Sequence, residues 1–223
     1  GLALELSEAF QIPFILRPAI RVCHARQNLE WGDLKGHGPK ASFERDPGRW
    51  AATPRFRFLL HRELNHKLQE ISLRFETLAP YNQHNLEPGK HYGVGIIAGG
   101  IPWSVVQDIL SEEERRDVPV LKLGAPYPFP QGLVDTFMNA CDRVLILEET
   151  DTLIEYLLRD QNRVLGRLSG DVPSEGELVP EVIYRVMDQV LKNHGLKGLS
   201  DSQDTTAGKL VETLELPIRK PTL

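Results

Sequence analysis

Short apolar runs alternate with segments of helical periodicity in the middle of the chain. Residues 93–100 form an apolar run that ends in two glycines, residues 103–110 follow a helical pattern, and residues 118–124 form a second apolar run. A helix between two continuous apolar runs is typical of a βαβ unit whose strands are covered on both faces. The alternation continues through residues 132–140, 143–147 and 152–159. The pattern predicts an α/β fold with an open, mostly parallel sheet and flanking helices, whose ligands or partners meet the strand carboxyl ends.

The predicted sheet domain ends with one more strand and one more helix. Residues 164–168 are predicted to form a last short strand. Ser174 with Glu177, and then Pro180, introduce a helix over 181–191. The sequence therefore predicts a main domain over residues 91–193. Polar residues dominate 194–223, which we expect to be a tail or a linker.

The region before this domain has a different character. An amphipathic helix over 2–10 and a short buried strand over 12–16 are predicted, and together they bury too little apolar surface to fold alone. We therefore expect residues 1–25 to be the last α/β unit of a truncated domain, and residues 26–90 to be a linker and a helix. The apolar stripe of that helix is expected to pack on a partner surface; it consists of Leu60, Leu64, Leu68, Ile71 and Phe75.

Composition and charge exclude several classes of protein. The 223 residues have a formal net charge of −5, which argues against a nucleic-acid partner. No apolar run is long enough to span a membrane and no signal-peptide pattern is present, so a cytoplasmic location is expected. Cys23 and Cys141 are far apart in the sequence; we expect both to be reduced and buried, and they cannot alone hold an iron–sulfur cluster.

Two sequence features suggest chemistry at the strand ends. The glycines of residues 93–100 match neither GxGxxG nor GxxxxGK[ST], so a packing turn is favoured over phosphate binding. Glu148 and Glu149 follow a predicted strand, but adjacent strand residues face opposite sides. A role in helix entry or in interdomain hydrogen bonding is therefore favoured over a paired acid and base.

Other candidate groups lie at domain edges. Arg17, Arg21 and His24 follow the first predicted strand, and Arg21 and His24 are candidates to face an anionic substrate. The seven histidines form no metal-binding pattern and no serine lies in a nucleophile elbow, so neither a metal site nor a hydrolase is predicted. Trp103 and the proline-rich residues 125–130 favour a protein contact at the rim of the sheet.

Several of these segments together resemble the alpha subunit of indolepyruvate ferredoxin oxidoreductase. The resemblance covers about residues 1–193, is weaker between 27 and 90, and lies in the order of the pieces along the chain. Those pieces are Ile-Pro-Phe-Ile-Leu-Arg-Pro at 12–18, Arg-Val-Cys-His at 21–24, residues 95–100, residues 120–124 with Tyr127-Pro128, Val-Leu-Ile-Leu-Glu-Glu at 144–149, and residues 170–180.

This resemblance implies an activity and a set of cofactors. Residues 1–25 would end the pyrimidine-binding domain of a thiamine-diphosphate enzyme, and residues 91–193 would be similar to the transketolase C-terminal domain. The complete enzyme would oxidatively decarboxylate aryl 2-oxoacids with coenzyme A, using thiamine diphosphate, Mg²⁺ and [4Fe–4S] clusters, with ferredoxin as electron acceptor and a smaller beta subunit as partner. None of these cofactors is expected on this chain alone, which would act as scaffold and interdomain contact.

Two alternative functions remain open from the sequence. The first alternative to the oxidoreductase is a nucleotide-binding α/β module. The second is a non-catalytic assembly domain without a ligand of its own. The sequence does not define which 2-oxoacid is used or what the oligomeric state is.

Overall fold

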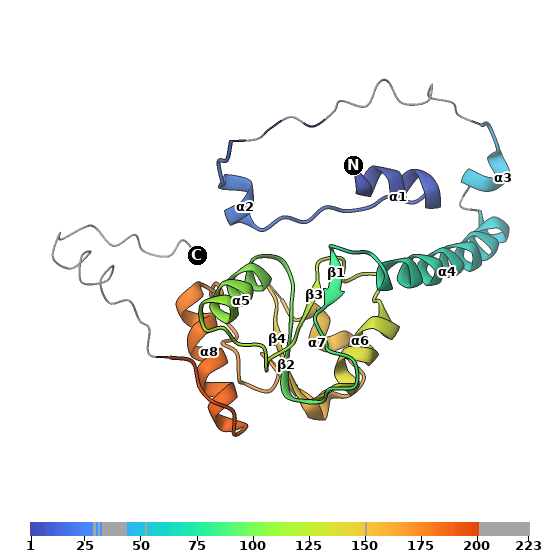
Figure 1. Ribbon diagram of the computed structural model, residues 1–223. Helices are drawn as coiled ribbons and strands as arrows, with labels where there is room; N and C mark the ends of the chain where they lie inside the picture. The colour runs from blue at the N-terminus through green and yellow to red at the C-terminus, as the bar shows by residue number, and fades with distance from the viewer. Residues whose placement is uncertain (29, 31, 33–43, 52, 150, 201–223) are drawn as a thin grey trace. The chain divides into compact units, whose positions relative to one another are not determined.

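The computed structural model describes residues 1–28, 30, 32, 44–51, 53–149 and 151–200, and the chain divides into two compact units. The first unit, Gly1–Leu73, contains short helices and most of one long helix (Figure 1). Its helices are α1 (Leu2–Phe10), α2 (Ile20–His24), α3 (Pro47–Trp50) and α4 (Pro54–Glu76), the last of which continues into the second unit.

The second unit, Arg74–Leu223, contains a five-stranded sheet in the order β1-β3-β2-β4-β5. β1 runs antiparallel to β3, and the other neighbouring pairs are parallel. The predicted open and mostly parallel sheet is therefore confirmed. Its strands are β1 (Asn82–His84), β2 (Tyr92–Ala98), β3 (Val120–Leu123), β4 (Cys141–Leu147) and β5 (Val164–Leu165).

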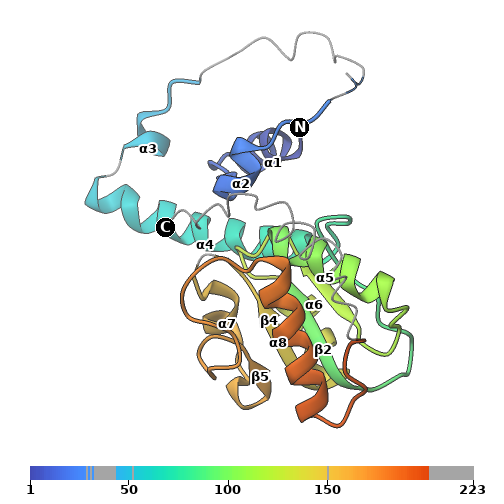
Figure 2. The ribbon, with the colours of Figure 1, turned by 90° about the vertical axis from the view of Figure 1, so that its left-hand side faces the viewer.

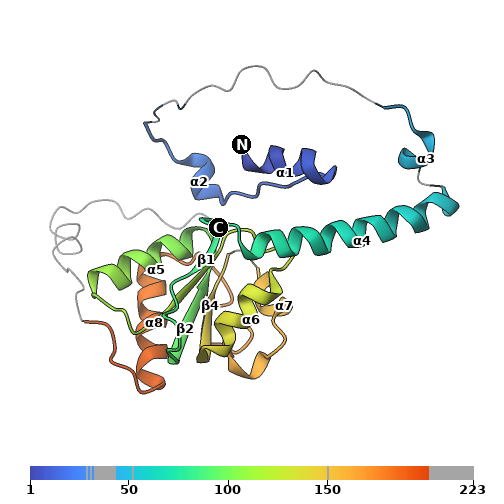
Figure 3. The ribbon, with the colours of Figure 1, turned by 45° about the vertical axis from the view of Figure 1, so that its right-hand side comes forward.

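Helices cover both faces of the sheet. α5 (Gly100–Glu112) and α8 (Pro180–Asn193) pack on one face, whereas α6 (Gln131–Asn139) and α7 (Leu153–Leu157) lie on the other (Figures 2 and 3). A 3₁₀ turn, η1 (Gln161–Arg163), precedes β5. In β4, Leu145 and Leu147 belong to the α5–α8 core, while Val144 and Ile146 belong to the opposite core. Burial on both faces explains why these strands appear as continuous apolar runs instead of alternating patterns.

Close packing requires glycine at two positions of the run 93–100, one within β2 and one just after it. A Cβ on Gly95 would lie 2.6 Å from the Cys141 Sγ and 2.9 Å from a ring carbon of Phe137. A Cβ on Gly99 would lie 2.7 Å from the Leu123 carbonyl oxygen. These contacts support the predicted packing role of the glycine run.

The predicted strand over residues 12–16 is not present. These residues are extended but pair with no strand in the described part of the chain, and Ile15 and Leu16 are 89% and 80% exposed. The apolar pattern was misleading because a strand also needs a neighbouring strand, which the described residues do not supply. Cys23, expected to be buried, is exposed on α2, whereas Cys141 is buried; both thiols are free.

α8 begins at the expected proline but without the expected side-chain cap. The residue that caps this helix is Val179, with Pro180 as the first helical residue and no side-chain capping bond. Ser174 therefore lies outside the helix, and the expected Ser174–Glu177 capping box does not form. A proline at the first helical position lacks only an N–H that would have no helical partner, so it begins the helix without a cap.

Two segments outside the predicted main domain belong to the second unit. β1 falls within the range expected to be linker and helix, and buried Asn82 holds it in place: its Nδ2 donates to the carbonyls of Phe75 at 3.0 Å and Ala125 at 3.1 Å. Within the expected tail, Leu199 is buried and its N–H donates to Asp188. The rest of the expected tail, residues 201–223, lies outside the described residues.

Replacing Gly95 with alanine is expected to lower the free energy of unfolding by about 1 to 3 kcal/mol, because the new methyl group overlaps Cys141 and Phe137. Gly93→Ala is the matched control on the same strand, since its Cβ would make only ordinary contact with Leu196 at 3.8 Å. Urea denaturation followed by circular dichroism measures both effects. Equal losses of stability in the two variants would contradict the packing argument.

Candidate active-site edge of the parallel sheet

The four parallel strands end at one edge of the sheet, which we call the carboxyl edge. The segments that leave it include 99–100 after β2, 124–130 after β3, 148–149 after β4 and 166–169 after β5. β2 and β4 are neighbours, but α5 after β2 and α7 after β4 cover opposite faces. Open α/β sheets bind ligands where consecutive helices diverge in this way, so the carboxyl edge is the candidate functional site.

Glu148, the first residue after β4, caps helix α7. Its carboxylate accepts hydrogen bonds from the backbone N–H groups of Leu153 at 3.0 Å, Ile154 at 2.8 Å and Glu155 at 3.1 Å. The side chain is buried, and this burial raises the pKa of the Glu148 carboxyl even though the three hydrogen bonds oppose the shift. The helix-entry role predicted for this residue is confirmed.

Two further carboxylates at the same edge also bind backbone groups. Glu149 accepts a 2.7 Å hydrogen bond from the N–H of Leu178, in the segment that leads to α8. Glu155, which is 1% exposed, accepts from the N–H groups of Arg167 at 2.8 Å and Leu168 at 3.0 Å. These carboxylates fasten the loops of the edge together, and this use does not leave them as a free acid and base pair.

The role of Glu155 at this edge has no signal in the sequence. Glu155 lies among apolar residues of a short helix, and no motif distinguishes it from a solvent-exposed helix glutamate. Only the turn after β5, which meets α7 in the fold, gives this carboxylate its partners.

Exposed apolar side chains surround the carboxyl edge. Among the described residues of the second unit, the exposed large apolar side chains lie on the connections at this edge, on α7, or just before β1. The start of β1 belongs to the same edge, because Asn82 pairs with Leu123 at the end of β3. We call this set the carboxyl-edge rim: Tyr81, Tyr127, Leu153, Tyr156 and Leu168. Clustered exposed aromatic residues are typical of protein contact surfaces, so the rim supports the interface expected at residues 125–130.

Trp103, the other residue expected at the interface, is partly buried on α5. The Lys122 Nζ lies 3.9 Å from the centroid of the Trp103 ring. This cation–π contact joins β3 to the first turn of α5. Trp103 therefore links two elements of the fold and packs against the core under α5 and α8.

The candidates Arg21 and His24 lie on α2 of the first unit. Arg21 is partly buried and His24 is exposed, and Arg17 precedes this helix. The two units are not placed relative to each other, so an active-site-facing role for Arg21 and His24 remains a prediction. Among the described residues, no group of three or more His, Cys, Asp or Glu side chains is arranged to hold a metal ion. No helix in the described part of the chain is long and apolar enough to cross a membrane.

The fold and this edge define the class of protein: an open α/β domain that presents loops and an apolar rim at its strand ends. Comparison with known proteins narrows this class. The chain is 32% identical over 224 residues to indolepyruvate oxidoreductase subunit IorA of Methanothermobacter thermautotrophicus, covering 99% of this chain and 35% of that protein. The subunit IorA of Thermococcus kodakarensis is 34% identical over 205 residues, covering 87% of this chain and 31% of that protein.

These matches confirm the predicted resemblance: the chain is related over nearly its whole length to a part of indolepyruvate oxidoreductase subunit IorA, a component of an oxidoreductase. It spans about a third of the length of these relatives. No protein-family model matches the chain. A solved 2-oxoglutarate:ferredoxin oxidoreductase from Magnetococcus marinus aligns with 64% of this chain and 24% of that chain, at 20% identity and a TM-score of 0.46.

Glu148→Ala is expected to lower the free energy of unfolding by about 1 to 2 kcal/mol, because the first turn of α7 loses the acceptor for three backbone N–H groups. Glu175→Ala, at an exposed glutamate of the segment before α8, is the control and should change stability little. Chemical denaturation of both variants measures the difference. A Glu148→Ala variant as stable as the control would contradict the capping role.

The stabilisation due to Glu148 is also expected to depend on pH. Burial raises the pKa of the Glu148 carboxyl in the folded state above its ordinary value of 4.5, so the folded state binds the proton more tightly than the unfolded state does. The stability difference between the wild type and Glu148→Ala should therefore be largest below pH 4.5 and should shrink as the pH rises through the folded-state pKa. Denaturation across this range, with NMR titration of the Glu148 carboxyl, measures it; a difference that grows with pH would be the opposite of what burial requires.

Proposed function

We propose that this chain is a segment of a thiamine-diphosphate-dependent oxidoreductase that oxidatively decarboxylates aryl 2-oxoacids such as indolepyruvate, with coenzyme A and ferredoxin. The observation that supports this function is the alignment of 99% of the chain with subunit IorA at 32% identity. Because the chain spans 35% of that relative, the activity belongs to the complete alpha subunit with its smaller beta subunit.

Within that enzyme, the chain acts mainly as scaffold and interdomain contact. The carboxylates at the carboxyl edge bind backbone N–H groups, as the bonds of Glu148 to α7 and of Glu149 to Leu178 illustrate. They hold the edge in a fixed shape, on which the carboxyl-edge rim offers Tyr127 and Tyr156, 62% and 68% exposed, to another domain. A fixed edge with exposed aromatic side chains suits the positioning of neighbouring domains that bind substrate and cofactor.

The cofactors of the complete enzyme are thiamine diphosphate, Mg²⁺ and [4Fe–4S] clusters. The described residues do not fit the metal-containing groups among these cofactors. They contain no cluster of three or more potential ligands, and burial raises the pKa of the Cys141 thiol to about 12, which disfavours the thiolate that binds metal. We assign the cofactors to the other domains of the alpha subunit and to the beta subunit.

A nucleotide-binding module is a weaker alternative. Packing explains the glycines at 95 and 99, because neighbouring atoms occupy the space that a side chain on Gly95 or Gly99 would need. An assembly domain without catalysis differs from our proposal only in the activity of the complete protein, so a direct measurement distinguishes them.

The test uses the complete alpha and beta subunits encoded around this segment. We expect indolepyruvate-dependent reduction of ferredoxin that requires coenzyme A, and we expect flanking sequence that encodes a Gly-Asp-Gly segment with a following Asn and a cysteine-rich cluster motif. Tyr127→Ser together with Tyr156→Ser should lower the activity several-fold and loosen subunit assembly in size-exclusion chromatography, because these side chains form the proposed contact.

Arg185→Ser, which changes an exposed residue of α8, is the control and should retain wild-type activity. The proposed function would be refuted by flanking sequence that encodes no iron–sulfur cluster motif. It would also be refuted if the complete protein transfers no electrons from any 2-oxoacid. Turnover by the isolated chain would refute the scaffold role.

A further inference from the structure

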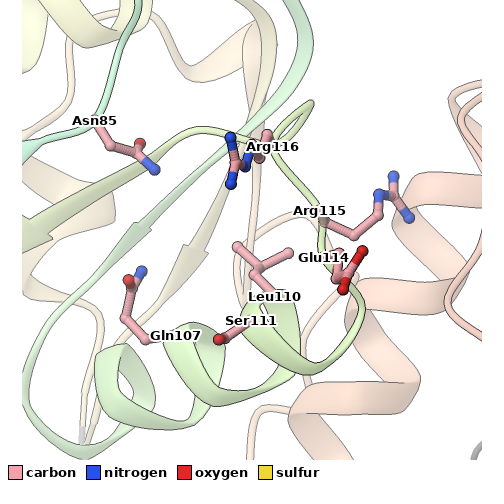
Figure 4. A pocket seen from close by; sticks show the side chains of 7 residues that line it. All are labelled: Asn85, Gln107, Leu110, Ser111, Glu114, Arg115 and Arg116. Carbon is pink, nitrogen blue, oxygen red and sulfur yellow. The ribbon is translucent and has the colours of Figure 1, made fainter.

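A polar pocket lies near the other end of the second unit, where α5 ends and the chain turns toward β3. Its volume is about 440 Å³, and its lining comes from α5, from the turn after α5, and from the residue after β1 (Figure 4). The lining residues are Asn85, Gln107, Leu110, Ser111, Glu114, Arg115 and Arg116. Only Leu110 is apolar, so a ligand would be held by hydrogen bonds and charge.

The end of α5 sets the directions of two adjacent arginines. The N–H of Glu114 donates to the Ser111 carbonyl at 3.2 Å and the N–H of Arg115 to the Leu110 carbonyl at 2.9 Å, a Schellman ending. Glu114 has a φ of 50°, the left-handed conformation that usually calls for glycine. This turn sends the side chains of Arg115 and Arg116 in different directions, as Figure 4 shows.

Arg115 is used by the fold. Its side chain is 8% exposed. The guanidinium forms two hydrogen bonds of 2.6 and 2.7 Å with Asp117 and donates to the carbonyls of Lys197 at 2.8 Å and Gly198 at 3.3 Å. It therefore fastens the segment after α8 to the end of α5. Its charge is already compensated, so Arg115 contributes shape to the pocket more than binding capacity.

Arg116 has no such partner. Within the part of the chain that the structure describes, its guanidinium makes no hydrogen bond or ion pair, although it lines the pocket. A guanidinium offers five N–H donors in a planar fork that matches carboxylate and phosphate oxygens. The pocket thus contains an exposed cation without an ion-pair partner among the described residues, together with the carboxylate of Glu114 on the side of Arg115 (Figure 4).

Neutral donors face the same pocket. The Oδ1 of Asn85 accepts a 2.7 Å hydrogen bond from the N–H of Val120, which fixes the amide and leaves its Nδ2 available. Gln107 and Ser111, one helical turn apart on α5, likewise form no side-chain hydrogen bond among the described residues. Amide and hydroxyl donors beside an arginine are the groups that hold an oxyanion.

We propose that this pocket binds a small polar molecule through a phosphate or carboxylate group, with Arg116 as the charged anchor and Asn85, Gln107 and Ser111 as hydrogen-bond donors. The site is separate from the carboxyl edge, so it does not depend on the function proposed above. The pocket also borders Arg115, whose guanidinium binds the carbonyls of Lys197 and Gly198 in the segment after α8.

Titration of the 223-residue chain with inorganic phosphate, and separately with acetate, tests the site. Heteronuclear NMR should show saturable shifts of the Asn85 and Gln107 side-chain amides with at least one of the two anions, and the stronger binder identifies the group. Arg116→Gln should weaken that binding about tenfold or more, because it removes the charge while keeping an amide.

Arg159→Gln removes an exposed arginine elsewhere in the second unit and is the matched control; it should leave the affinity unchanged. Gln107→Ala is a second test that keeps the net charge and should weaken binding several-fold. The proposal is overturned if neither anion causes saturable shifts, or if Arg116→Gln and Arg159→Gln bind with the same affinity while their melting temperatures match that of the wild type.

Discussion

The close approach of β2 to β4 and α6 is the constraint on which the second unit depends. Gly95 has no side chain because the Cys141 sulfur and the Phe137 ring occupy that space. The absence of a side chain lets α6 lie against the centre of the sheet, while Val94 and Ile96 fill the opposite core under α5 and α8. Both faces of the sheet are therefore closed by apolar contacts, and polar chemistry is confined to its edges.

At the carboxyl edge, carboxylate side chains cap a helix and bind the backbone N–H groups of neighbouring loops. Glu148 joins β4 to the start of α7, Glu155 joins α7 to the turn after β5, and Glu149 joins β4 to the approach to α8. This series of bonds makes the edge a fixed surface even though its segments carry little regular structure. The rim residues are presented by that surface, which is a physical basis for a contact role in a larger enzyme.

The opposite end of the unit is organised by a different device. The left-handed Glu114 ends α5, and the side chains of the two arginines that follow it point in different directions (Figure 4). Arg115 binds the segment after α8, whereas Arg116 lines the pocket without a partner among the described residues. The two ends therefore have different characters: hydrogen-bonded carboxylates with apolar rim side chains at one, and an arginine with neutral donors at the other. Each follows from how a helix or strand ends, where backbone groups lack partners within the element.

The sequence by itself determined the alternation of strands and helices from β2 to α8, because apolar runs buried on both faces and helical periodicity are local properties. It also predicted the helix-entry role of Glu148, the packing role of the glycine run and the relation to IorA. It did not determine whether residues 12–16 pair as a strand, whether Cys23 is buried, or that the polar triplet of β1 joins the sheet, since each depends on partners far along the chain. Only the tertiary structure decided that Glu155 binds the turn after β5 and that Arg115 binds the carbonyls of Lys197 and Gly198. These contacts join residues whose separation in the sequence says nothing about their distance in space.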